Sequence, residues 1–91
     1  MTLKTDKIKN ALLKKGFKIQ ESDHHFFSFY CNGEKTTIRT KISHGEKEID
    51  DSLINKMQKQ LHLTKQEFLD LINCPLSEDE YKKLMFQRNV I

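Results

Sequence analysis

The residues with the most evident chemistry are two adjacent histidines, His24 and His25, which open an aromatic segment of the chain. An imidazole gains and loses a proton near neutral pH, so it can take a proton from a ribose 2′-hydroxyl and return one to the departing 5′-oxygen. Cleavage of RNA that leaves a cyclic phosphate is therefore the chemistry to consider. The alternative is that His24 only ends a strand or binds a phosphate, because lone surface histidines seldom catalyse reactions.

A predicted β-hairpin places the two histidines on different faces. Residues 24–31 are rich in aromatic side chains, residues 34–42 are rich in threonine and β-branched side chains, and Asn32-Gly33 lies between them. Asn-Gly predicts a two-residue turn, because both of its residues readily adopt the positive φ that this turn needs. The predicted pairs are Cys31–Glu34, Tyr30–Lys35, Phe29–Thr36, Ser28–Thr37, Phe27–Ile38, Phe26–Arg39, His25–Thr40 and His24–Lys41.

One face of this hairpin is basic and aromatic, and the other is apolar. Side chains alternate along a strand, so His24 lies beside Lys41 on the open face, whereas His25 turns toward the helices. The candidate substrate-binding residues of the open face are Lys41, Arg39, Phe26, Lys35 and Tyr30, together with Lys18. The aromatic rings could stack unpaired bases while the cations bind phosphates. The alternative for Phe26 is burial beneath the C-terminal part of the chain or in a partner interface.

Before and after the hairpin, the periodicity predicts further elements. Apolar positions at helical spacing indicate a helix over residues 5–15, with Thr5 as its N-cap and Gly16 at its end. Residues 17–20 alternate between apolar and polar side chains, which is the period of a half-buried strand. The charged segment over residues 43–49 is predicted to be a loop.

The second half of the chain is predicted to be helical. Asp50 or Asp51 can cap a second helix, and capping boxes that start at Thr64 and Ser77 begin a third and a fourth. The tail after Phe86 is expected to fray. One helix, a three-stranded antiparallel meander and further helices predict a single α+β domain over residues 1–91, with two layers and one open sheet face.

Composition and charge narrow the classes of function. The chain has 91 residues, of which 36% are hydrophobic, and no apolar run approaches the roughly 20 residues of a transmembrane helix. No segment has the pattern of a secretory signal, so we expect a cytoplasmic protein. Residues 1–47 hold ten Lys or Arg against five Asp or Glu, which favours a polyanionic partner. Cys31 and Cys74 are far apart, and no pair of His or Cys has the spacing of a zinc site, so no metal or cofactor is predicted.

Several short motifs together resemble the HicA toxins of bacterial and archaeal toxin-antitoxin systems. These motifs are a helix that ends in Gly16-Phe17, the segment Ser22-Asp23-His24-His25, a strand with Thr36-Thr37-Ile38, and an amphipathic helix that ends in Lys59-Gln60-Leu61-His62-Leu63. The resemblance covers residues 5–63, the length of a typical member. Residues 64–91 form a helical C-terminal extension beyond it.

This resemblance implies a fold, an activity and a partner. It implies a double-stranded-RNA-binding-like fold, a metal-independent endoribonuclease (a hydrolase) that cleaves messenger RNA with one histidine, and inhibition by a HicB antitoxin. His24 then takes the catalytic role, with Lys41 and Arg39 as phosphate ligands. The family commonly has Gly-Ser before the histidine, whereas this chain has Ser22-Asp23. The alternative is a noncatalytic RNA-binding or protein-interaction module of the same fold.

Overall fold

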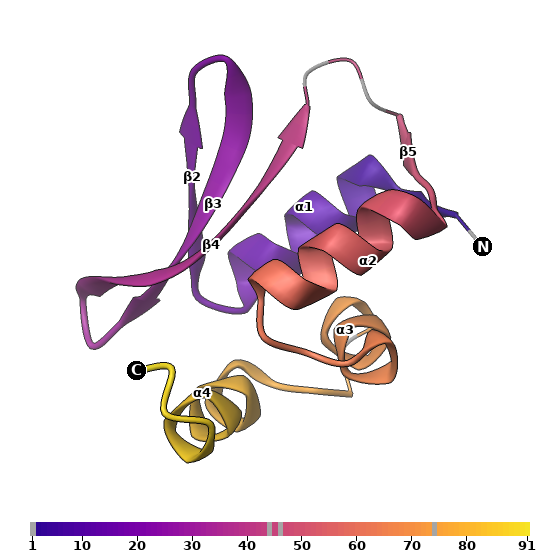
Figure 1. The fold of residues 1–91 in the computed structure, drawn as a ribbon. Coiled ribbons are helices and arrows are strands. Elements are labelled where there is room, and N and C mark those ends of the chain that lie inside the picture. Colours follow the sequence, from indigo (N-terminus) through magenta and orange to yellow (C-terminus); the bar gives the residue numbers. More distant parts are fainter. Residues whose placement is uncertain (1, 44, 46, 74) are drawn as a thin grey trace.

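The computed structural model describes residues 2–43, 45, 47–73 and 75–91, so predictions that fall on His44 and Cys74 lie outside the described residues. Its elements are β1 (Leu3–Lys4), α1 (Thr5–Lys14), β2 (Phe17–Glu21), β3 (His24–Cys31), β4 (Glu34–Ser43), β5 (Glu48–Ile49), α2 (Asp51–Gln60), α3 (Lys65–Ile72) and α4 (Glu78–Gln87). Strands β2, β3 and β4 form an antiparallel sheet in that order, and β1 pairs with β5 (Figure 1). The predicted α+β class with a three-stranded antiparallel sheet and additional C-terminal helices is confirmed.

The start of α1 differs from the prediction. Lys4, not Thr5, occupies the N-cap, and its side chain makes no capping hydrogen bond. The reason is that Glu48–Ile49, in the segment predicted to be a loop, forms β5 against β1. The backbone N–H of Thr5 donates instead to the carbonyl of Lys47, at 3.0 Å.

Gly16 ends α1 as predicted, with a φ of +92° that favours glycine. A Cβ atom at this position would lie 2.8 Å from Oε2 of Glu78 and 3.1 Å from the ring of Phe29. The turn after α1 therefore passes close to both the start of α4 and the sheet. Replacing this glycine would strain the backbone and displace these neighbours.

The predicted hairpin register is correct near the turn and wrong beyond it. Tyr30 pairs with Lys35 as predicted, but from Ser28 back to His24 each residue pairs two positions further along β4, so His24 faces Ser43 and not Lys41. The shift lies at an irregularity between Ser28 and Tyr30, where the hydroxyl of Thr36 donates to the carbonyl of Phe29 at 2.7 Å. A shift of two residues leaves every side chain on its predicted face.

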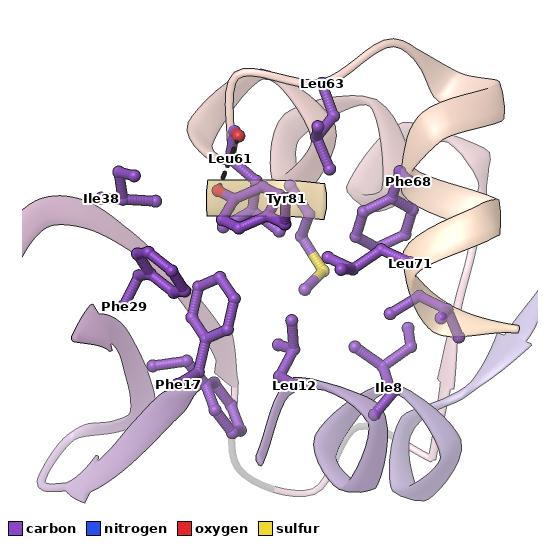
Figure 2. Packing of buried hydrophobic residues seen from close by; sticks show 14 of the residues in the cluster. Ile8, Leu12, Phe17, Phe29, Ile38, Leu61, Leu63, Phe68, Leu71 and Tyr81 are labelled. Carbon is purple, nitrogen blue, oxygen red and sulfur yellow. Dashed lines mark hydrogen bonds between the residues drawn. The ribbon is translucent and has the colours of Figure 1, made fainter. Parts of the chain in front are cut away.

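The apolar face of the sheet, α1 and the C-terminal helices share one core (Figure 2). Tyr81 of α4 is fully buried, and its ring lies 5.0 Å from that of Phe29 and 5.7 Å from that of Phe17. Its hydroxyl donates to the carbonyl of Leu61 at 2.9 Å. Burial raises the pKa of Tyr81. Residues 64–91 thus complete the core and are not a loosely attached extension.

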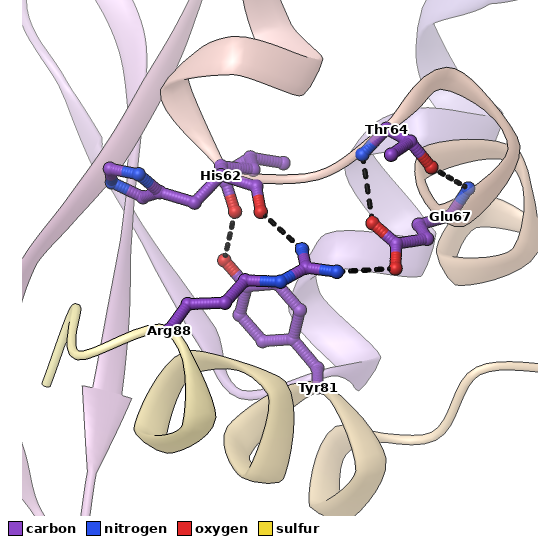
Figure 3. A network of polar contacts seen from close by, with 6 residues as sticks. His62, Thr64, Glu67, Tyr81 and Arg88 are labelled. Atoms are coloured by element: carbon purple, nitrogen blue, oxygen red, sulfur yellow. Dashed lines mark hydrogen bonds and ion pairs between the residues drawn. The ribbon is translucent and has the colours of Figure 1, made fainter.

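A polar network fixes α4 to the turn between α2 and α3 (Figure 3). Arg88 donates to Oε2 of Glu67 and to the carbonyl of His62, each at 2.6 Å. Glu67 also completes the capping box of α3, which begins at Thr64 as predicted. The hydrogen bond from Arg88 and a second from the backbone of Thr64 lower the pKa of Glu67.

The end of the chain is ordered, which corrects the prediction of a frayed tail. Helix α4 continues to Gln87, and Asn89 adopts a positive φ of 58°. The backbone N–H of Val90 then donates to the carbonyl of Met85 at 2.9 Å, and this bond closes the helix end. Val90 and Ile91 pack against the core. Of the helices in the described part of the chain, none is long and apolar enough to cross a bilayer.

Candidate functional site

The outward face of the sheet brings together aromatic rings and cations from all three strands. Phe26 of β3 lies between two neighbours on this face: its ring is 6.0 Å from that of His24 and 5.0 Å from the guanidinium carbon of Arg39. Farther along the sheet, Nζ of Lys18 lies 4.4 Å from the centre of the Tyr30 ring. Both contacts have the geometry of cation–π pairs. The predicted basic and aromatic face is therefore present, and its members touch one another.

The C-terminal helices do not cover this face. Tyr81 packs against Phe17 and Phe29, which point to the opposite side of the sheet from Phe26. Phe26 itself is half-buried among its neighbours in β3 and β4. Burial of Phe26 beneath the described part of residues 64–91, one of the two alternatives for this residue, is therefore wrong.

His24 also lines a cavity of about 260 Å³, where the end of the sheet meets α2. The polar side chains of its lining belong to His24, Lys41, Ser43, Lys56 and Gln60. Ile42, Ile49, Leu53 and Met57 supply the apolar part. The cavity thus combines one imidazole, two ammonium groups and an apolar wall, a combination that suits a ligand with negative charge and a flat apolar part.

Helix α2 is held at this position by a contact with β4, one of the two edge strands of the three-stranded sheet. The hydroxyl of Thr40 donates to Oε1 of Gln60 at 2.6 Å. Because Lys56 precedes Gln60 by one helical turn, the same contact places Lys56 beside the cavity. The position of Lys56 therefore depends on how α2 docks against the strand.

A second, more open hollow of about 300 Å³ adjoins the first. It is lined by Phe26, Arg39, Thr40, Lys41 and Gln60. Lys41 and Gln60 line both spaces, so the cavity and the hollow meet at these two residues. Four of the predicted site residues therefore line these two adjacent recesses, and Lys41 lies where the recesses meet; the four are His24, Phe26, Arg39 and Lys41.

His25 has a different environment, as the predicted alternation requires. Its side chain is 15% exposed, and Nδ1 lies 3.0 Å from Oε1 of Glu21 on the neighbouring strand β2. His25 faces Ile42 across the hairpin and is not among the described residues that line the cavity. Of the two histidines, His24 is the one placed to meet a ligand.

The remaining predicted residues lie at the other end of the face. Tyr30 and Lys35 are paired beside the hairpin turn. Tyr30 is six residues from His24 along β3, which corresponds to about 20 Å at roughly 3.3 Å per residue. Lys35 and Tyr30 therefore could contact a long ligand such as RNA, but not the atoms beside His24.

Lys56 is the functional candidate that sequence reasoning missed. The sequence does place Lys56 on one helical face, which it shares with Leu53, Met57 and Gln60. The apolar members of that face, Leu53 and Met57, predict only core positions. Which strand the face meets depends on the docking of α2 and cannot be obtained from periodicity.

Comparisons with known proteins identify no family for this chain. No family model matches the chain, and no curated protein or solved structure matches it significantly. Within the described ranges, no group of three or more His, Cys, Asp or Glu side chains is arranged to hold a metal ion. The residues around His24 are therefore what indicates a function.

Proposed function

We propose that this protein is a HicA-like mRNA interferase with a double-stranded-RNA-binding-like fold. RNA binds across the open face of the sheet, and His24 cleaves it by acid–base catalysis. The observation that carries this proposal is the position of His24, on the wall of a cavity that also holds Lys41 and Lys56 and beside the Phe26–Arg39 pair. An imidazole can supply acid–base catalysis, cations stabilise the charge of a phosphate, and an aromatic ring can stack an unpaired base.

The reaction balances without a metal or a cofactor. The neutral imidazole of His24 takes the proton of a ribose 2′-hydroxyl, and the 2′-oxygen forms a bond to the adjacent phosphorus. The bond from phosphorus to the 5′-oxygen breaks, and that oxygen receives the proton from the imidazolium. The products are a 2′,3′-cyclic phosphate and a 5′-hydroxyl. Lys41 and Lys56, with Arg39 nearby, stabilise the charge on the phosphorane oxygens.

The proposal includes a location and a partner. A messenger-RNA nuclease would act in the cytoplasm and would need an inhibitor to spare its host. The open face, with its half-buried Phe26 and exposed Arg39 and Lys41, offers an inhibitor of the HicB antitoxin class a surface that covers His24 at the same time. Inhibitor and RNA would then compete for one surface.

A second candidate function is a noncatalytic RNA-binding or protein-interaction module of the same fold. The observation that favours it is Ser22-Asp23, which stands where the HicA toxins commonly have Gly-Ser. Asp23 is exposed at the turn before β3 and adds a negative charge next to His24. Such a module would retain the cation–aromatic face but would leave RNA intact.

Expression in a bacterial host separates the two candidates. The wild-type chain, His24→Ala and His25→Ala are induced to equal levels, and growth and transcript integrity are followed. We expect the wild-type and His25→Ala proteins to slow growth and fragment transcripts, and His24→Ala to do neither. Equal growth and intact transcripts with the wild-type and His24→Ala proteins would remove the nuclease, and RNA binding without cleavage would then support the module.

A further inference from the structure

We infer that the cavity and the hollow beside it are two nucleotide subsites, so the ligand is single-stranded RNA with one unstacked base inserted next to His24. This inference rests on the proposed function and specifies its substrate class. Its starting point is that two recesses lie side by side and share Lys41 and Gln60.

The first subsite has the size and lining for one base. Its volume of about 260 Å³ lies below the roughly 300–1,000 Å³ of sites that enclose whole small-molecule ligands. Leu53 and Met57 supply an apolar wall for the face of a base, and Gln60 and Ser43 supply donors and acceptors for its edge. A flat group with a polar edge therefore fits this cavity.

The second subsite suits a stacked base. Phe26 lines the hollow, and the guanidinium of Arg39 lies over its ring, 5.0 Å from the ring centre, so a planar cation lies over an aromatic ring in an open recess. Bases of single strands stack on such rings and on guanidinium planes. The next nucleotide of the chain could therefore rest on this pair.

The phosphate between the two nucleotides must then pass the shared boundary. Lys41 lies at that boundary, and Lys56 and His24 belong to the cavity beside it. A base in the cavity brings its own ribose close to His24, with the following phosphate at Lys41. The two-subsite arrangement thus places the 2′-hydroxyl, the imidazole and the phosphate together, as the proposed cleavage requires.

Two bases held in separate recesses cannot remain stacked and paired in a duplex. A duplex would have to be opened at this step, and the energy of unpairing and unstacking would be lost from binding. We therefore expect the protein to prefer a single strand over a duplex of the same sequence by about tenfold or more.

Binding to RNA that cannot be cleaved tests this inference. The probe is a short 2′-O-methyl single strand with one 2-aminopurine, and the comparison is the same strand in a duplex. Leu53→Trp fills the cavity, and Ser52→Trp is the matched control, since Ser52 is exposed on the same helix and is not among the described lining residues. Thermal unfolding verifies that both variants fold.

We expect the wild-type protein to favour the single strand and to raise the fluorescence of the unstacked 2-aminopurine. We expect Leu53→Trp to weaken binding by about fivefold or more, and Ser52→Trp to change it by less than about twofold. Two results would overturn the two subsites while leaving RNA binding intact. One is equal affinity for the single strand and the duplex, and the other is an equal change of affinity in Leu53→Trp and Ser52→Trp. If Leu53→Trp fails to fold, the strand-to-duplex ratio decides. Failure to bind either RNA would overturn the proposed function as well.

Discussion

Replacing Lys56 by glutamine should reduce the salt dependence of RNA binding by the amount that one phosphate contact contributes. Each contact with a single strand contributes about 0.7 to the slope of log K against log salt concentration. Arg39, Lys41 and Lys56 surround the two recesses and would together give a slope of about −2.1. Loss of one contact in the variant would reduce the magnitude of this slope, to about −1.4. From these contacts alone, affinity between 50 and 200 mM salt falls about 18-fold for the wild type and about 7-fold for the variant. Lys18 and Lys35 lie farther along the face and add equally to both slopes.

Fluorescence anisotropy with a labelled 2′-O-methyl RNA strand, titrated at several salt concentrations, measures both slopes. Lys59→Gln is the matched control, because Lys59 is an exposed lysine of α2 that is not among the described residues lining the recesses. We expect this control to keep the wild-type slope. Equal changes of slope in both variants, or no change in either, would refute the assignment of Lys56 to a phosphate.

Three predictions concern the fold that positions the site. Tyr81→Phe should lower the free energy of unfolding by about 1–2 kcal/mol, since the carbonyl of Leu61 loses its donor. Burial raises the pKa of Tyr81, so ionisation of this tyrosine should destabilise the folded wild-type protein above about pH 10. Thermal unfolding in an alkaline pH series should show this loss in the wild type and not in the variant, which has no hydroxyl at this position. Glu67→Gln should cost about 0.5–1 kcal/mol at pH 7, because a partly exposed ion pair with Arg88 is lost. Since the folded chain lowers the pKa of Glu67, that stabilisation is present above about pH 4.3 and disappears in acid, where wild type and variant should converge in thermal melts. Deleting residues 64–91 should abolish cooperative unfolding, measured by circular dichroism, and a cooperative transition in the shortened chain would contradict the shared core.

The faces of the hairpin could be predicted from the sequence because alternation is a local property. His24 and His25 were separated, and Phe26 was placed with Arg39, from strand periodicity alone. The register error did not disturb these assignments, since the irregularity between Ser28 and Tyr30 shifts the pairing by an even number of residues. Local signals of the same kind, two capping boxes and a glycine after a helix, also predicted the starts of α3 and α4 and the end of α1.

What could not be predicted depends on contacts between distant segments. Strand β5 exists because Ile49 meets Leu3, and neither short segment has a strand pattern of its own. Lys56 reaches the cavity only because α2 docks beside β4 through Thr40 and Gln60. The role of the C-terminal helices likewise depends on tertiary packing, which periodicity reports only as an apolar face.

The chemistry of the cleaved ends tests the central claim most directly. Purified wild-type, His24→Ala and His25→Ala proteins are incubated with a single-stranded RNA in the presence of a chelator, and the products are identified by mass spectrometry. We expect the wild-type and His25→Ala proteins to release 2′,3′-cyclic phosphate and 5′-hydroxyl ends, and His24→Ala to release none. Cleavage by His24→Ala at the wild-type rate, or products that carry 5′-phosphates, would contradict the assignment of His24 as the catalytic residue.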